Sequence, residues 1–201
     1  MAKTISICNQ KGGVGKTTTA INVSTYLALG NKRVLLIDAD PQANATSGLG
    51  IDKSKVEKSV YDSMMSDSNI EESIQKSAVP NMDILPSNMD LTGVEIELVP
   101  LISREYRLKK ALERIKDKYD FIIIDCPPSL GLITINALTA SDSVLIPLQC
   151  EYYALEGLTQ LINTIDLIKN NLNSKLEVEG VLLTMADYRT KLTSEVIKEA
   201  R

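Results

Sequence analysis

The stretch Thr4-Ile5-Ser6-Ile7-Cys8-Asn9-Gln10-Lys11-Gly12-Gly13-Val14-Gly15-Lys16-Thr17-Thr18 decides the fold of this chain. Its first five residues form an apolar, β-branched run, which predicts a buried strand over residues 4–8. After the glycines, apolar residues recur at helical spacing and predict a helix over residues 16–29. A strand, a glycine-rich turn and a helix in this order are typical of a phosphate-binding loop.

The loop contains Gly12, Gly13 and Gly15, which allow positive φ and a close approach of the backbone to a ligand. Successive N–H groups can then point at the β- and γ-phosphates of a nucleotide, at the positive end of the following helix. Lys16 adds a cation to those oxygens, and the Thr17 hydroxyl is placed to hold Mg²⁺. The alternative is a glycine-rich turn without this function, which the flanking strand and helix disfavour. The predicted nucleotide site comprises Gly12, Gly13, Val14, Gly15, Lys16, Thr17 and Thr18.

Strand and helix patterns alternate along the rest of the chain. The predicted strands cover residues 4–8, 33–38, 82–85, 121–125, 143–148 and 178–184. The predicted helices cover residues 16–29, 60–65, 70–76, 101–118, 132–139, 155–171 and 192–200. Gly30 stands where a left-handed helix cap favours a residue without Cβ. The predicted fold class is α/β, with a mainly parallel β-sheet flanked by helices on both faces.

Length and composition indicate one folded domain. The chain has 201 residues, of which 44% are hydrophobic and 24% charged, as in ordinary globular proteins. It begins without a signal-peptide pattern and contains no long apolar run, so we expect a cytoplasmic protein. The last helical pattern stops without a cap or a following strand, which is typical of a fragment. We therefore expect a single P-loop ATPase domain over residues 1–201, truncated at its C-terminus.

The residue types restrict the chemistry. The chain has no histidine, so catalysis would use carboxylates, lysines, hydroxyls, backbone amides or a bound metal ion. Cys8, Cys126 and Cys150 stand far apart in apolar runs, and we expect three buried thiols instead of a zinc or redox pair. The net charge of −4 does not indicate nucleic-acid binding, which would need a local basic patch.

Carboxylates follow two of the predicted strands. Asp38 and Asp40 come at the end of the second strand, and Asp125 ends the apolar run Phe121-Ile122-Ile123-Ile124 before Pro127-Pro128. In open α/β sheets, ligands bind outside the carboxyl ends of the strands. Asp125 has the Walker B pattern, in which a carboxylate holds a water of the Mg²⁺ shell. Each motif alone is also compatible with a polar turn at a strand end, but together they occur in the expected order.

The loop departs from the general form G-x-x-x-x-G-K-[ST], because Gln10 replaces the first glycine and Lys11 adds a second lysine. In this respect the sequence resembles the deviant Walker A ATPases, and Asn9 to Thr18 resembles the ParA (Soj) branch of chromosome- and plasmid-partitioning ATPases. The resemblance extends over essentially the whole chain, including Glu95-Ile96-Glu97-Leu98 and residues 149–157. One departure is Ala43, where members of the family usually carry glycine.

The resemblance implies ATP and Mg²⁺ as cofactors and an ATP-sandwich homodimer. Lys11 would reach across the dimer interface to the partner's phosphates, and with Lys16 and Asp40 it forms the expected catalytic set. Asp40 would position or activate the attacking water. Thr17, Asp38 and Asp125 are the expected metal-site residues. The family also implies non-specific binding to double-stranded DNA, a ParB-type (Spo0J-like) partner that stimulates hydrolysis, and a nucleoid-associated protein in the cytoplasm.

Two basic stretches are candidates for the DNA surface. The first lies within residues 101–118, where interspersed acidic and apolar residues are also typical of an ordinary amphipathic helix. The second, which we favour because the family's DNA-contacting surface lies there, comprises Arg189, Lys191, Lys198 and Arg201.

One alternative function remains, and the sequence argues against two others. A membrane-recruited cell-division ATPase of the MinD type shares Lys11 and Lys16, but residues 9–10 and 149–157 favour ParA, for which we expect no membrane. An iron–sulfur reductase of the nitrogenase iron-protein type needs cysteines outside the sheet, which the positions of the three cysteines disfavour. A metabolic ligase or kinase would need a substrate pocket that no motif indicates.

Overall fold

The computed structural model describes residues 2–66, 69–151, 154–187, 189 and 191–200. Within them the chain forms a seven-stranded sheet with strand order β3-β4-β2-β5-β1-β6-β7. All neighbouring strands are parallel except the short edge pair of β3 and β4. The strands are β1 Lys3–Ile7, β2 Val34–Asp38, β3 Gln75–Lys76, β4 Met82–Leu85, β5 Phe121–Asp125, β6 Ser143–Gln149 and β7 Glu177–Thr184.

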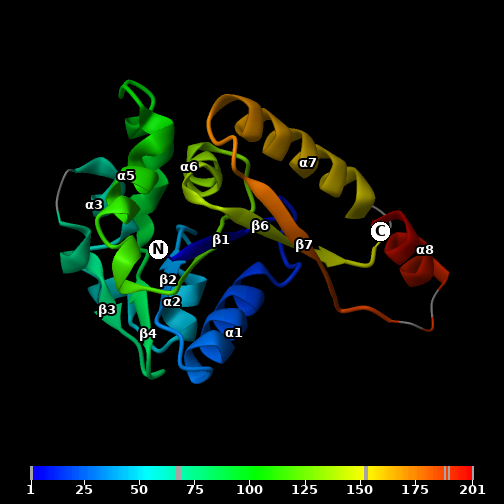
Figure 1. The fold of residues 1–201 in the computed structure, drawn as a ribbon, viewed down its shortest axis with the longest axis horizontal. Coiled ribbons are helices and arrows are strands. Elements are labelled where there is room, and N and C mark those ends of the chain that lie inside the picture. Colours follow the sequence, from blue (N-terminus) through cyan, green and yellow to red (C-terminus); the bar gives the residue numbers. More distant parts are fainter. Residues whose placement is uncertain (1, 67–68, 152–153, 188, 190, 201) are drawn as a thin grey trace.

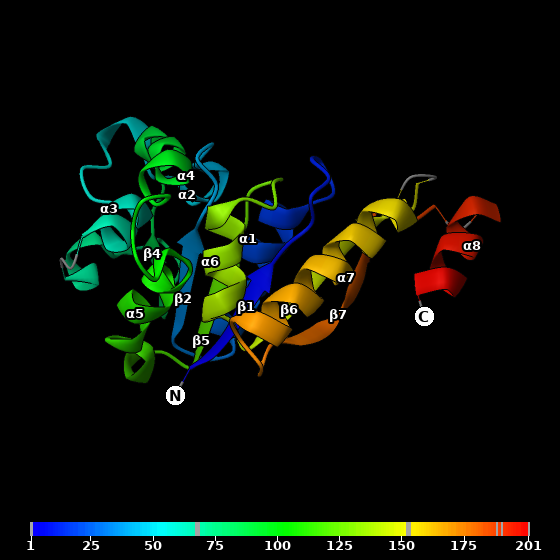
Figure 2. The same cartoon turned by 90° about the horizontal axis from the view of Figure 1, so that it is seen from above.

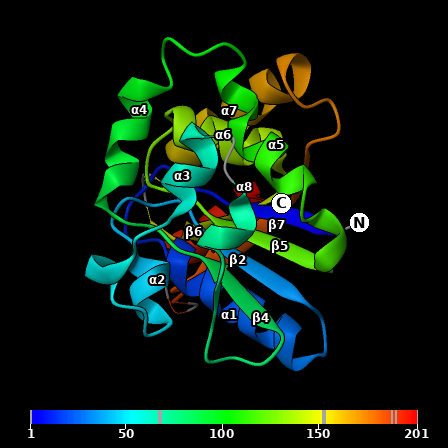
Figure 3. The ribbon, with the colours of Figure 1, turned by 90° about the vertical axis from the view of Figure 1, so that its left-hand side faces the viewer.

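Helices cover both faces of this sheet, as Figures 1 and 3 show. The helices are α1 Lys16–Leu29, α2 Asn44–Gly48, α3 Val60–Met65, α4 Val94–Glu97, α5 Arg107–Glu113, α6 Leu132–Ala140, α7 Ala154–Asn171 and α8 Lys191–Ala200. Helix α1 packs on one face, while α5, α6 and α7 pack on the other. The predicted fold class is confirmed.

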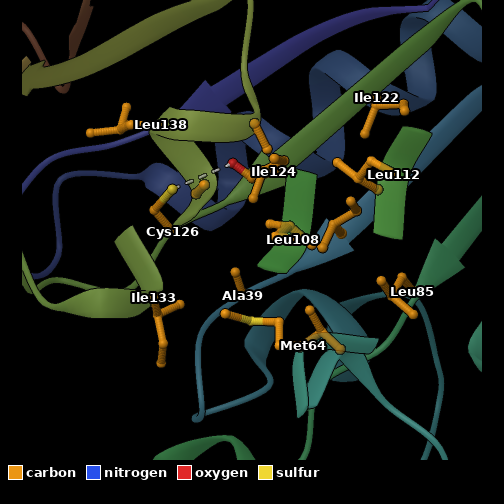
Figure 4. Packing of buried hydrophobic residues seen from close by; sticks show 14 of the residues in the cluster. Ala39, Met64, Leu85, Leu108, Leu112, Ile122, Ile124, Cys126, Ile133 and Leu138 are labelled. Atoms are coloured by element: carbon orange, nitrogen blue, oxygen red, sulfur yellow. Dashed lines mark hydrogen bonds between the residues drawn. The ribbon is translucent and has the colours of Figure 1, made fainter. Parts of the chain in front are cut away.

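Two apolar clusters hold these layers together. The larger one joins α3, α5 and α6 to the sheet and includes Met64, Leu108, Leu112, Ile124 and Ile133 (Figure 4). The smaller one packs the α1 side chains against the opposite face of the central strands. Strands β2 and β5 are almost wholly buried, because helices lie above and below them. No helix of the part that the structure describes is long and apolar enough to cross a membrane.

Two predicted helices are wrong in part. Residues 101–118 form a 3₁₀ turn Arg104–Tyr106, the helix α5 and a second turn Lys116–Lys118 instead of one helix. The Asn136 side chain of α6 accepts a hydrogen bond from the Leu108 backbone N–H and donates one to the Arg104 carbonyl, so tertiary bonds replace helical ones there. Residues 70–76 form the 3₁₀ helix Ile70–Ser73 followed by β3.

The predicted cap of α1 is also wrong. Gly30 has φ of −78°, and the left-handed residue is the next one, Asn31, with φ of 60°. Asparagine tolerates this conformation better than most residues with a Cβ.

Candidate nucleotide-binding site

The carboxyl ends of the three central strands form the base of the site. In the sheet register, Ile7 of β1 and Asp38 of β2 both lie opposite Asp125 of β5. The glycine-rich loop follows β1 directly, and α1 begins immediately after it. Parallel pairing therefore places two carboxylates beside the start of the loop, as the sequence predicted.

The loop has the backbone shape that its glycines allow. Gly13 and Gly15 have φ of 76° and 86°. A Cβ on Gly13 would meet no atom within 4 Å, so the positive φ, and not crowding, requires glycine there. Gly15 is the N-cap of α1 and gives it no side-chain cap, and the first turn of α1 carries no acidic residue. The N–H groups of this turn can therefore serve an anion.

Lys16 lies inside the loop. Its side chain is buried, and its Nζ donates a hydrogen bond of 3.0 Å to the Lys11 carbonyl. Burial lowers the pKa of Lys16, while the charges of Asp125 and Asp40 oppose that shift. An anionic ligand in the loop would stabilise the ammonium further.

Asp125 is a buried carboxylate without a hydrogen-bond partner on either oxygen among the described residues. Burial, with smaller contributions from the charges of Asp38 and Asp40, raises the pKa of Asp125 to about 7. Thr17 and Lys16 lower that pKa, although the Thr17 hydroxyl makes no hydrogen bond of ordinary geometry with the carboxylate. A divalent cation beside Thr17 would give the orphaned carboxylate its counter-charge, so these residues fit Mg²⁺.

Asp38 and Asp40 differ in their surroundings. Asp38 is fully buried, and its Oδ2 accepts hydrogen bonds of 2.7 Å from both the Thr46 backbone N–H and the Thr46 hydroxyl. Burial raises the pKa of Asp38, and these bonds oppose the shift. Asp40 lines the pocket described next, with Oδ1 accepting a hydrogen bond of 2.9 Å from the Gln42 backbone N–H. Asp38 thus anchors α2 through Thr46, while Asp40 contributes to the lining of the pocket.

These elements enclose one pocket of about 360 Å³. It is lined by Gly12, Gly13, Gly15, Lys16, Thr17, Thr18, Asp40, Gln42, Asn44 and Pro128. The structure thus brings together most of the predicted nucleotide site, and it adds Gln42 and Asn44, to which no sequence motif assigns a role. A second cavity of about 450 Å³ lies beside Arg33, Asn81 and Tyr119, near the first residues of β2, β4 and β5. It has no phosphate-binding backbone, so the glycine-rich loop marks the functional site.

Known proteins of similar sequence support a nucleotide-binding function for this site. Residues 2–178 match the family model described as AAA domain. The chain is 62% identical over 201 residues to the sporulation initiation inhibitor protein Soj of Bacillus subtilis, covering 100% of this chain and 79% of that protein. It is 53% identical to the chromosome partitioning protein ParA of Myxococcus xanthus, covering 100% of this chain and 71% of that protein. The chain belongs to the ParA/Soj family.

A solved structure supports the same fold. A cobyrinic acid a,c-diamide synthase from Mycobacterium smegmatis, crystallised with ADP and magnesium, superposes with a TM-score of 0.94 at 40% identity. The match covers 99% of this chain and 81% of that chain. The predicted P-loop NTPase fold of the ParA/Soj family is confirmed.

The second lysine of the ParA/Soj loop is held within its own subunit. Lys11 Nζ forms an ion pair with Glu151, which follows β6, and both side chains are partly exposed. The Lys11 backbone N–H also donates a hydrogen bond of 2.9 Å to Asn9 Oδ1. The sequence alone does not indicate this partner, because 140 residues separate Lys11 from Glu151.

Ala43, the departure from the ParA/Soj pattern, lies at a strained position. It is the N-cap of α2, fully buried, with φ of 54° and ψ of 42°. This left-handed conformation explains why glycine is favoured there. The following turn still forms, since the Ala43 carbonyl accepts a hydrogen bond from the Ser47 N–H.

The described residues of the predicted DNA-binding set lie after the edge strand β7, just before and on α8, whose position Figure 1 shows. Arg189 is 89% exposed in its side chain and forms a bidentate ion pair with Asp187. Lys191 and Lys198 are exposed on α8, and Arg201 lies outside the described residues. In the rival stretch, Lys118 pairs with Glu71 and Arg104 with Glu105.

The cysteines are only partly as predicted. Cys8 and Cys126 are buried with their Sγ atoms 2.7 Å apart, a proximity that the sequence did not indicate, while Cys150 is half-buried. All three are free thiols. No group of three or more cysteine or acidic side chains that could hold a metal ion occurs among the described residues.

Proposed function

We propose that this chain is a partitioning ATPase that requires ATP and Mg²⁺, dimerises when ATP is bound, and in that state binds double-stranded DNA without sequence preference. The observation that carries the proposal is the pocket of about 360 Å³ lined by Lys16 and Thr17, beside the buried carboxylate of Asp125, which has no hydrogen-bond partner among the described residues. A neutral ligand would leave that carboxylate uncompensated, whereas a magnesium nucleotide would not.

The residues of the pocket divide the chemistry of phosphoryl transfer between them. The loop amides and Lys16 would hold the phosphates, and Thr17 and Asp125, with Asp38 beside them, would hold the metal. Mg²⁺ would neutralise charge on the phosphate oxygens. Asp40 would orient the attacking water, since its carboxylate lines the pocket on the side of Gln42 and Asn44. Hydrolysis would end the ATP-bound state.

Lys11 would join two subunits. Its side chain is partly exposed at the rim of the loop and is bound only by a surface carboxylate among the described groups. A lysine in this position can exchange that carboxylate for the phosphates of a partner subunit, which carry more charge. The ATP-bound form is therefore proposed to be a homodimer with two shared nucleotides.

A dimer would double the weak basic surface of each subunit. Arg189, Lys191 and Lys198 are exposed near α8, and two copies would give salt-sensitive binding that one copy lacks. We further propose a ParB-type partner that stimulates hydrolysis and releases the dimer, in the cytoplasm and on the nucleoid. The partitioning relatives favour this function over the MinD-type alternative.

The test is a DNA-binding assay with Mg-ATP, Mg-ADP or no nucleotide, at several salt concentrations. Binding should appear only with ATP and weaken steeply with salt. Lys16→Ala, which removes the ammonium of the pocket, should abolish nucleotide and DNA binding together. A parallel assay with anionic liposomes separates the MinD-type function, because ATP-dependent binding to liposomes without DNA binding would contradict our proposal.

A further inference from the structure

We propose that Glu95 is a positioning residue for ATP hydrolysis, acting on the loop between β5 and α6 from the neighbouring helix α4. This inference rests on the hydrolysis proposed above and names a residue to which neither the sequence motifs nor the comparisons assign a role. The loop concerned, residues 126–131, follows the Walker B carboxylate and carries Pro128 into the lining of the nucleotide pocket.

Helix α6 begins without a cap of its own. Its N-cap residue is Gly131, in extended conformation, with no side chain to bind the free N–H groups of the first turn. The Glu95 carboxylate supplies that function from 36 residues earlier in the chain. Its Oε2 accepts a hydrogen bond of 2.8 Å from the Leu132 N–H, and its Oε1 accepts one of 3.2 Å from the Ile133 N–H. Both oxygens therefore hold the positive end of α6.

Gly131 is shaped for this contact. A Cβ at that position would lie 2.4 and 2.6 Å from the two Glu95 oxygens, closer than atoms can approach. The φ of Gly131 is −81°, which any residue can adopt, so the backbone does not require glycine, but a side chain there would have to displace the carboxylate. Glu95 and Gly131 are thus two halves of one contact.

Both ends of α4 are fixed in the core. Val94 and Leu98 on either side of Glu95 are fully buried in the larger apolar cluster. The carboxylate therefore extends from a rigid base, and the start of α6 takes its position from α4. Figure 2 shows α4 above the end of the sheet from which α6 begins.

The pocket loop is then held at both ends. At its start, the Cys126 N–H donates a hydrogen bond to the Ile7 carbonyl of β1. At its end, Glu95 fixes Leu132 and Ile133, and the buried Thr134 hydroxyl donates a hydrogen bond of 2.6 Å to the Ser129 carbonyl. Pro128 lies between these anchors. Without Glu95, residues 126–131 would no longer be held in one conformation beside the transferred phosphate. The glycine-rich loop, which binds the nucleotide, would stay intact.

The experiment compares Glu95→Ala, Glu95→Gln and Gly131→Ala with the wild-type chain, using phosphate release and a fluorescent ATP analogue. Glu95→Ala should lower kcat roughly 10- to 100-fold, with nucleotide affinity within about two-fold of wild type, because misplacement affects the reacting geometry more than binding. Glu95→Gln keeps one acceptor oxygen and should recover part of kcat. Glu97→Ala is the matched control, since Glu97 lies on the same helix but binds the Tyr61 hydroxyl instead.

The double variant Glu95→Ala, Gly131→Ala gives the sharpest test. Gly131→Ala alone should impair turnover as Glu95→Ala does, because the new Cβ displaces the carboxylate. Once the carboxylate is gone, the three atoms nearest to that Cβ are removed, so Gly131→Ala should change kcat less than two-fold in that background. Independent, multiplying effects would overturn the proposal, as would a normal kcat in Glu95→Ala.

Amide exchange at Leu132 and Ile133 tests the contact without turnover. Glu95→Ala should accelerate exchange at both amides, with and without Mg-ADP, and Glu97→Ala should not. Unchanged exchange would overturn the proposal even if hydrolysis were absent. Absence of turnover in the wild-type chain would instead contradict the proposed ATPase function.

Discussion

Asp40 is positioned by its own turn and directed to the pocket. Its backbone N–H donates a hydrogen bond of 3.2 Å to Asp38 Oδ1, and its Oδ1 accepts one from Gln42. The carboxylate is therefore fixed before any substrate arrives, which is the condition for orienting a water molecule. The residues that would hold the nucleotide belong to other segments, so binding and turnover can be separated by mutation.

Asp40→Ala should separate them. We expect ATP hydrolysis to fall about 10²- to 10⁴-fold, because a general base or water-orienting group is lost, while nucleotide affinity stays near wild type. The variant should accumulate as an ATP-bound dimer on DNA. Phosphate release and light scattering in Mg-ATP measure the two effects. Hydrolysis at the wild-type rate would exclude Asp40 from the reaction.

In the proposed dimer, Lys11 must leave Glu151 before it can reach the second subunit. Surface ion pairs of this kind contribute about 0–1 kcal/mol each, and a homodimer would break two of them, so losing both should favour dimerisation by up to about 30-fold. Glu151→Gln should therefore dimerise at lower ATP concentration, and Lys11→Ala should bind ATP as a monomer. Glu179→Gln is the control, because it removes an ion pair with Lys3 far from the loop. A Glu151→Gln variant that dimerises less well would show that Glu151 supports the interface.

At the scale of single elements, α2 depends on one buried threonine. The Thr46 hydroxyl donates a hydrogen bond of 2.7 Å to Asp38 and accepts one of 3.0 Å from the Ser87 N–H, so it joins β2 to the segment after β4. Thr46 and Ser87 are fully buried. No water can replace these bonds without a cavity, so the hydroxyl fixes both segments beside the pocket.

Thr46→Val should therefore destabilise the fold with little change in volume. We expect a loss of about 2–4 kcal/mol in the free energy of unfolding, because a bond to a carboxylate is removed and the Ser87 N–H is left buried without a partner. Denaturant unfolding measures the loss. Ser47→Ala, on the exposed side of the same helix, should change stability by less than about 0.5 kcal/mol. Equal effects of the two variants would contradict this role of Thr46.

The elements that could be predicted from sequence are those fixed by local pattern. Strand β5 could be predicted because burial on both faces requires a continuous apolar run. Helix α1 could be predicted because its apolar residues recur at helical spacing. Helix α5 was predicted too long. The Leu108 N–H at its start bonds to the Asn136 side chain, and Asn136 is remote in sequence. Strand β3 was missed because two residues carry no periodicity.

The site divides in the same way. The loop, Asp40 and Asp125 stand at or just after the ends of strands, so their positions follow from the order of elements. Glu151 and Glu95 act on residues 140 and 37 positions away, respectively, through contacts that only the tertiary fold creates. No spacing rule applies to such contacts, so the sequence could not indicate them.

At the scale of the whole molecule, the nucleotide pocket and the basic residues near α8 belong to separate parts of the chain. Arg189→Ala should therefore weaken DNA binding of the ATP form and make its salt dependence shallower by roughly two per dimer, since each subunit loses one phosphate contact. ATP-dependent dimerisation should stay unchanged. Binding at varied salt and light scattering test both points. A shallower slope in Lys110→Ala, on α5, and not in Arg189→Ala would place the DNA surface on the other basic stretch.

The strand order affects how the protein folds during its synthesis on the ribosome. Strand β1, which precedes the glycine-rich loop, lies between β5 and β6, and its Lys3 pairs with Phe121. At about 5–20 residues per second, translation needs roughly 6–24 s to produce that partner after β1 has been made. Until then the apolar strand β1 has no neighbouring strand to pair with. The glycine-rich loop also lacks the end of β5, which lies beside it in the folded protein. We expect the nascent chain to depend on chaperones during this interval, and nucleotide binding to begin only after β5 has emerged.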